Sequence, residues 1–206
     1  EIVPYPLYFA YRLSILLLGL SLAAAPQASV PVPTPPSVAG NGHLLIDMHS
    51  DAVLAAKDPG QQLEPASLTK MMTAYAVLYA MQNGSVNAED KVRVSEKAWR
   101  MKGSKMFVEV DTQVPVRELI KGLIIQSGND ATVAVAEHLA GSESAFADMM
   151  NQHAQQLGMH SSNFLNATGL PAEGHVTTAR DLATLARAMI EEFPDYYAWH
   201  AVKEYT

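Results

Sequence analysis

The chain has 206 residues, of which 49% are hydrophobic and 17% are charged, so it carries enough apolar material for one substantial core and indicates one domain. A formal net charge of −7, with no run of Lys and Arg, argues against a nucleic-acid-binding protein. The absence of cysteine excludes disulfides, thiolate metal sites and a cysteine nucleophile.

The beginning of the chain has the pattern of an export signal. Arg12 precedes the apolar run LSILLLGLSLAAA at 13–25, which has the length of a signal-peptide core. The run is shorter than the roughly 20 residues that a membrane-spanning helix needs. Ala23 and Ala25 form an A-x-A cleavage signal, and Ala28 is a second candidate. We therefore expect an exported protein that functions in the periplasm or at the outer face of a bacterial cytoplasmic membrane.

A proline-rich stretch, PQASVPVPTPPSVAGNG, follows this run. Proline at this density cannot continue a helix and is typical of a linker. The sequence thus predicts a signal peptide at 1–28, a linker at 29–42 and a folded domain at 43–206.

The predicted domain begins with strands and continues with helices. The segment 43–58 has two apolar runs around the turn His49-Ser50-Asp51 and predicts a hairpin, and the alternating segments 91–96 and 105–110 predict two further strands. Helix start signals at Pro65, Pro115, Ser142 and Thr178, with stop signals at Asn83-Gly84, Gly141 and Gly158, predict helices at 66–82, 116–126, 131–140, 143–157 and 179–193.

The helix expected at 66–82 is apolar on all sides, which is typical of a helix buried in the middle of a domain. One hairpin and two short strands cannot cover such a helix. Either the helices pack on one another, or the sheet is completed by residues that this sequence lacks.

Ser67 and Lys70 lie at the beginning of this apolar helix. Side chains three residues apart on a helix are neighbours, so the hydroxyl and the amine can share a hydrogen bond. A serine becomes a nucleophile when an adjacent base accepts its proton, and burial lowers a lysine pKa toward the range where it can be that base. The spacing alone carries little weight, since a lysine at a helix start is ordinarily exposed and without a catalytic role. The position of Lys70 on a helix without a polar face favours the catalytic interpretation.

A second polar group, Ser127-Gly128-Asn129, interrupts two apolar helices. The glycine permits a tight bend, so both polar side chains can point into one cleft. We expect Ser127 to relay a proton and Asn129 to orient a substrate peptide bond. The pattern S-x-N also occurs at Ser85 and Ser161, and we interpret both as surface turns.

The segments PASLTKMMTAY, IIQSGNDATVAVAEHLAG and FLNATGLP, in this order, resemble the low-molecular-weight penicillin-binding proteins, specifically the serine D-Ala-D-Ala carboxypeptidases. The resemblance runs from about Leu44 to the last residue. It implies an α/β (α+β) fold of the β-lactamase/transpeptidase type, a helical cluster against an antiparallel sheet. It also implies that Ser67 is the acylated nucleophile, Lys70 its general base, and Ser127 with Asn129 the second active-site element.

The implied reaction removes the terminal D-Ala of a peptidoglycan stem pentapeptide through an acyl-enzyme that β-lactams trap, with no metal or organic cofactor. The family's third motif, K-T-G, has no counterpart here, because Lys102-Gly103-Ser104 and Lys121-Gly122 come too early. We therefore expect 43–206 to be a truncated catalytic domain with an incomplete sheet. Membrane association would occur only through C-terminal segments of the family that this sequence lacks.

Two other classes remain as alternatives. A class A β-lactamase would need a glutamate four residues before Asn166, where Ser162 stands. A catalytically incomplete module that contacts peptidoglycan without turnover is distinguished from an enzyme by its failure to form a covalent β-lactam adduct. A metal site is disfavoured because the histidines at 138, 153, 160 and 175 lack short ligand spacing. Trp99 is expected to be a buried anchor.

Overall fold

The computed structural model describes residues 35–205. The expected signal peptide and the first part of the expected linker, 29–34, lie outside the described residues. The elements below all belong to one unit, Ser37–Thr206. Within the described range, no helix has both the length and the apolar character needed to cross a membrane.

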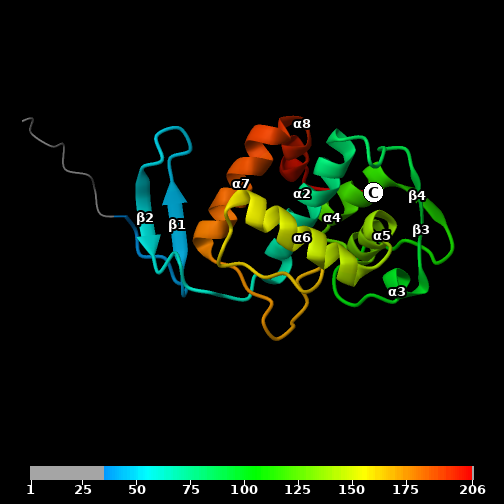
Figure 1. Ribbon diagram of the computed structural model, residues 1–206, viewed down its shortest axis with the longest axis horizontal. Helices are drawn as coiled ribbons and strands as arrows, with labels where there is room; N and C mark the ends of the chain where they lie inside the picture. Colours follow the sequence, from blue (N-terminus) through cyan, green and yellow to red (C-terminus); the bar gives the residue numbers. More distant parts are fainter. Residues whose placement is uncertain (1–34, 206) are drawn as a thin grey trace, which may run out of the picture. The chain divides into compact units, whose positions relative to one another are not determined.

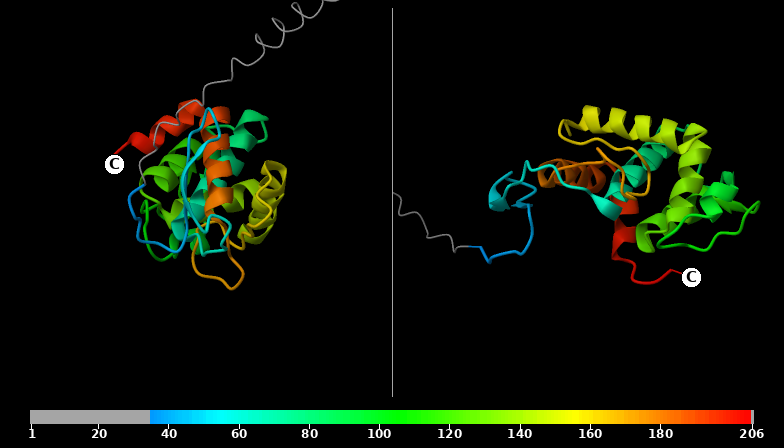
Figure 2. Two further views of the ribbon diagram at one scale, coloured as in Figure 1. Left: turned by 90° about the vertical axis from the view of Figure 1, so that its left-hand side faces the viewer. Right: turned by 90° about the horizontal axis from the view of Figure 1, so that it is seen from below.

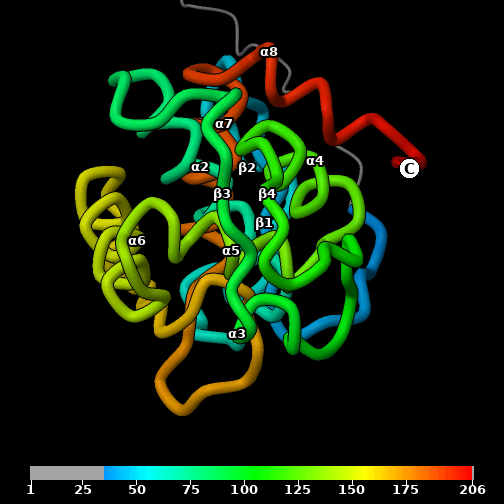
Figure 3. Tube along the Cα trace, turned by 90° about the vertical axis from the view of Figure 1, so that its right-hand side faces the viewer, coloured from blue at the N-terminus to red at the C-terminus, as the bar shows by residue number. Residues whose placement is uncertain are grey.

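The strands form two separate antiparallel pairs. The expected hairpin is confirmed, with β1 (His43–Ile46) paired to β2 (Val53–Lys57), and its turn is held by Asp47, whose carboxylate accepts the backbone N–H of Ser50 at 2.8 Å. The second pair is β3 (Lys91–Arg93) and β4 (Gln113–Pro115). Figure 1 shows the hairpin beside α7, and Figure 3 shows β3 and β4 running side by side at the opposite side of the helices.

The strand predicted at 105–110 is wrong. Its alternating pattern is real, but the carboxylate of Asp130 accepts the backbone N–H groups of Met106, Phe107 and Val108 at 2.8, 2.8 and 3.2 Å. Those donors are the ones that a strand would offer to a neighbouring strand. Phe107 also has a φ of 65°, outside the extended region. The segment is therefore a loop tied to a buried acid.

The helices follow the predicted order. They are η1 (Ala66–Leu68), α2 (Thr69–Gln82), α3 (Glu96–Trp99), α4 (Val116–Ile125), α5 (Asn129–Ala140), α6 (Glu143–Leu157), α7 (Ala179–Glu192), α8 (Pro194–Tyr197) and η2 (Ala198–Ala201). The predicted caps are confirmed: Ser142 accepts the N–H of Ala145, and Thr178 accepts the N–H of Asp181. Of the short helices, α3, α8 and η2 were not predicted, because four residues are too few for a periodic pattern.

Helix α2 is the centre of the packing, as its apolar sequence predicts. It contacts α4, α5, α6 and α7 (Figures 1 and 2). The large side chains without solvent contact, most of them on these helices, are Phe146, Phe164, Met72, Leu78, Leu119, Ile120, Leu123, Met150, Met159 and Leu185. Of the two arrangements left open by the sequence, the described residues adopt the one in which the helices pack on one another.

Trp99 is less buried than expected. At the end of α3 its side chain is 39% exposed, and the guanidinium of Arg100 lies 5.9 Å from the ring centroid. Trp99 is the last residue of the four-residue helix α3, where its side chain is in part exposed to solvent.

Candidate active site

Ser67 lies in the turn that leads into α2. The sequence predicted that Ser67 would lie in the first turn of the α-helix. The structure instead places it in the 3₁₀ helix η1, which precedes α2. The preceding Ala66 has a φ of 47°, an uncommon conformation for a residue with a Cβ atom. Such strain is concentrated at functional sites, where the surrounding structure holds it in place. The Ser67 side chain is exposed and accessible to a substrate.

Lys70 is buried on the first turn of α2, with 5% of its surface exposed. Its Nζ donates a hydrogen bond to the backbone carbonyl of Thr168 at 2.9 Å. Desolvation disfavours the charged ammonium and lowers the pKa of Lys70 to about 8. A neutral amine still donates one N–H to Thr168 while its lone pair is free to accept a proton. Lys70 thus has the environment of a general base.

Ser67, Lys70 and Ser127 line one cavity of about 110 Å³, which we call the serine–lysine cavity. Leu123 on α4 and His200 on η2 also line it. The predicted nucleophile and base, from the segment 67–70, and the predicted relay hydroxyl, from the break after α4, therefore line the same cavity. His200 was not singled out in the sequence, since nothing there indicates that η2 reaches this cavity.

The break at Ser127-Gly128-Asn129 lies between α4 and α5, as predicted. Ser127 has a φ of 55°, and a Cβ atom on Gly128 would lie 2.9 Å from the backbone nitrogen of Met106, so only glycine fits this close approach. Asn129 begins α5 and is 5% exposed; its Nδ2 donates to the carbonyl of Lys102 at 2.6 Å. In this structure its amide holds the neighbouring loop.

Asn129 lies at a second cavity, of about 260 Å³, which Ser67 also lines. This loop-side cavity is lined by Ser67, Asn129, Thr168, Gly169 and His175, among others. Ser67 is common to both cavities, so a substrate held in the larger one can present its carbonyl to a hydroxyl whose base lies in the smaller one.

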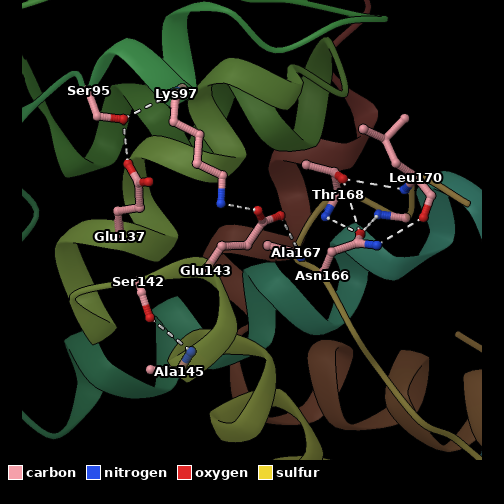
Figure 4. A network of polar contacts seen from close by, with 12 residues as sticks. Ser95, Lys97, Glu137, Ser142, Glu143, Ala145, Asn166, Ala167, Thr168 and Leu170 are labelled. Atoms are coloured by element: carbon pink, nitrogen blue, oxygen red, sulfur yellow. Dashed lines mark hydrogen bonds and ion pairs between the residues drawn. The ribbon is translucent and has the colours of Figure 1, made fainter. Parts of the chain in front are cut away.

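The loop 163–177 supplies the acceptor for Lys70, and Asn166 shapes it (Figure 4). The side-chain oxygen of Asn166 accepts the N–H groups of Thr168 and Gly169 at 3.1 and 2.7 Å, and its nitrogen donates to the carbonyl of Leu170 at 2.9 Å. Glu143, paired with Lys97 at 2.6 Å, accepts the N–H of Ala167 at 3.3 Å. These bonds fix the direction of the Thr168 carbonyl.

Gly169 packs directly on the turn that carries Ser67. With a φ of 82°, it approaches Ala66 so closely that a Cβ atom would lie 1.8 Å from the Ala66 carbonyl oxygen. We expect Gly169→Ala to displace the loop from Ala66, and to destabilise the fold by about 1–3 kcal/mol through strain at the positive φ and the forced shift. Urea unfolding measures the free energy. Gly174→Ala is the matched control: Gly174 has a φ of 85°, but its added Cβ would meet nothing closer than 3.9 Å. A loss for Gly169→Ala no larger than that of the control would contradict the close-approach argument.

Sequence reasoning missed Thr168, because a backbone carbonyl leaves no mark on residue type. It also missed Asp130 and His175. A carboxylate placed directly after the polar break between two apolar helices could have indicated Asp130, which is 1% exposed. A larger cavity, of about 310 Å³, lies at the other end of α2 beside Leu78 and Tyr196, away from Ser67 and Lys70. Among residues 35–205, no group of three His, Asp or Glu side chains is arranged to hold a metal ion.

The fold that encloses Ser67 and Lys70 is shared with solved penicillin-binding proteins. Among solved structures, the chain is similar to penicillin binding protein 5 from Haemophilus influenzae, with 40% identity and a TM-score of 0.82 over 84% of this chain and 52% of that one. It is also similar to penicillin binding protein 6B from Escherichia coli, with 38% identity and a TM-score of 0.80 over 85% of this chain and 57% of that one. The predicted fold class is thereby confirmed.

Residues 29–206 match the family described as D-alanyl-D-alanine carboxypeptidase, and the chain belongs to that family. D-alanyl-D-alanine carboxypeptidase DacA of Haemophilus influenzae is 40% identical over 176 residues, which are 84% of this chain and 45% of the relative. DacC of Escherichia coli is 42% identical over 177 residues, 83% of this chain and 44% of the relative. The chain thus spans a little under half the length of these curated relatives.

Proposed function

We propose that the chain is the acylating part of a penicillin-sensitive serine D-Ala-D-Ala carboxypeptidase acting on peptidoglycan stem pentapeptides. The observation that carries the proposal is that Lys70, buried and with its pKa lowered to about 8, shares one cavity with Ser67 and Ser127. The proposal includes export to the periplasm or to the outer face of the cytoplasmic membrane, based on the apolar run at 13–25.

The mechanism begins with neutral Lys70, which takes the proton of Ser67 as Oγ attacks the carbonyl of the penultimate D-Ala. The oxyanion that forms is stabilised in part by the Ser67 backbone N–H, since the first N–H groups of a helix have no intrahelical acceptor. The proton then passes, through Lys70 and the Ser127 hydroxyl, to the nitrogen of the terminal D-Ala as the peptide bond breaks. Free D-Ala leaves, and an ester joins Ser67 to the shortened peptide.

Water completes the cycle by attacking the ester, with Lys70 accepting a proton of the water and returning it to Ser67 Oγ. The products are the shortened peptide carboxylate and the free serine. A β-lactam enters through the same first step: its amide bond opens, its nitrogen receives the proton, and its acyl group stays on Ser67. Asn129, in the loop-side cavity, would hold the amide of either compound.

Incubation of the purified chain with benzylpenicillin tests the proposal. We expect an increase in intact mass equal to one penicillin, which peptide mapping places on Ser67. Ser67→Ala should form no adduct, whereas Ser144→Ala, which removes an exposed serine of α6, should form it as the parent does. A folded parent chain that forms no adduct would contradict the proposal and favour a peptidoglycan-contacting module without turnover.

A further inference from the structure

His175 is buried in the loop 163–177 and makes two hydrogen bonds through its ring. It is 3% exposed. The backbone N–H of Leu165 donates to Nδ1 at 3.0 Å, and Nε2 lies 2.8 Å from the hydroxyl oxygen of Thr69. Because Nδ1 accepts a hydrogen bond, the proton of the neutral ring must be on Nε2, which therefore donates to Thr69.

Thr69 stands between the proposed nucleophile and the proposed base. It is fully buried at the first position of α2, two residues after Ser67 and one before Lys70. The His175–Thr69 bond therefore joins the loop to the start of α2, between the proposed nucleophile and the proposed base.

The same loop contacts α2 at two further places and η1 at one. Thr73 donates to the carbonyl of Ala167 at 2.7 Å, Lys70 donates to the carbonyl of Thr168 at 2.9 Å, and Gly169 packs against Ala66. His175 is the one member of this set whose side chain comes from the loop. Its bond therefore fixes the separation between the Thr168 carbonyl and the turn of Ser67.

We propose that neutral His175 is a positioning residue, which through Thr69 holds the turn carrying Ser67 in register with the loop carbonyl that binds Lys70. The proposal rests on the function proposed above, since it assigns to His175 the alignment of that nucleophile and base. His175 is not assigned contact with the reacting atoms.

Protonation would break this arrangement. A second N–H, on Nδ1, would face the N–H of Leu165, so two donors would meet and the acceptor would be lost. Burial lowers the pKa of His175, and the carboxylate of Glu64, in the segment before η1, partly offsets this effect. The Phe164 ring packs against the imidazole in an edge-to-face arrangement, with 5.8 Å between the two ring centroids. The amine of Lys70 on α2 is hydrogen-bonded to the Thr168 carbonyl. The neutral form is thus favoured in the folded state, and its stabilisation is lost as the pH falls below the pKa of an unfolded histidine, near 6.5.

Two amide substitutions separate the two hydrogen bonds. Asn at 175 keeps an acceptor near the Nδ1 position and loses the donor to Thr69, while Gln keeps a donor near the Nε2 position and loses the acceptor for Leu165. In the full chain, with a fluorescent penicillin as the probe, we expect His175→Ala and His175→Asn to reduce the acylation rate constant about tenfold or more. His175→Gln should restore most of the rate. His160→Ala, which removes an exposed histidine, should have no effect.

Thr69 supplies the second half of the test. Thr69→Val should reduce acylation as much as His175→Asn does, the double variant should lose no more than either single one, and Thr69→Ser should retain the rate. The pH profile gives a signature that a general loss of structure does not. At low pH, where Lys70 and His175 are both protonated, the logarithm of the rate should fall with a slope of about two, and in His175→Gln with a slope of about one.

Nitrogen-15 NMR of the imidazole distinguishes a failure of this inference from a failure of the proposed function. We expect a neutral ring protonated on Nε2 at pH 7, whether or not penicillin reacts. A parent chain that forms no adduct but shows this tautomer would contradict the proposed function alone. If the parent is acylated, and folded His175→Asn is acylated at the same rate, or the ring is protonated on Nδ1, the positioning role is overturned.

Discussion

Lys70→Ala is expected to slow the acylation of Ser67 by penicillin by about 10²–10⁴-fold at pH 7, the usual contribution of a general base. The physical reason is that the substitution removes the buried amine to which the Ser67 proton is transferred, from a cavity that it lines together with Ser67. The measurement is the second-order rate of adduct formation by stopped-flow or quenched mass spectrometry. Lys70→Arg should be equally slow, because a guanidinium keeps the charge but cannot act as a base at this pH.

The pH dependence of the parent chain checks the same assignment from the other direction. Because burial lowers the pKa of Lys70 to about 8, the acylation rate should rise about tenfold per pH unit just below 8, where His175 is neutral, and level off above 8. Lys91→Ala, which removes an exposed lysine of β3, should leave both the rate and this profile unchanged. Acylation of Lys70→Ala at the parent rate would exclude Lys70 as the base.

Asp130→Ala is expected to destabilise the chain by about 3–5 kcal/mol. The buried carboxylate accepts the backbone N–H groups of Met106, Phe107, Val108 and Ala131, so its removal leaves these donors without their charged acceptor. Urea denaturation followed by circular dichroism measures the change in the free energy of unfolding.

Asp130→Asn gives the intermediate case. The amide oxygen can still accept from Met106 and Ala131, whereas the amide nitrogen would face the N–H groups of Phe107 and Val108, so we expect about half of the loss. Asp148→Ala, at an exposed position on α6, should change the stability by less than about 0.5 kcal/mol. Equal stabilities of the parent and Asp130→Ala would show that the loop 102–108 is held by other contacts.

Much of the helical part was predictable because its signals are local. Helix α2 is apolar on all sides and is buried, and Ser142 and Thr178 accept the cap hydrogen bonds that their positions indicate. The strand at 105–110 was wrong for a non-local reason. Its alternating pattern cannot show that a carboxylate more than twenty residues later takes the N–H groups that a strand would use.

The candidate site divides in the same way. Ser67 and Lys70 were singled out as polar residues at the start of an apolar helix, and Ser127 as part of a polar break between two apolar helices; all three line one cavity. Thr168 acts through its backbone carbonyl, which any residue possesses, and His175 depends on a contact 106 residues away in the sequence. Residue types therefore indicate the reacting groups, whereas the groups that align them are visible only in the fold.

The pKa of Lys70 depends on the burial of α2 among the surrounding helices. Since desolvation is the cause of its lowered pKa, the groups that bury the amine and keep water from it hold that pKa below its usual value of 10.5. A substitution that admits water into the interior would move the pKa back toward 10.5 and shift the reactive pH range upward, without touching the serine. The packing of the helices therefore helps to set the pH range in which the proposed base is neutral.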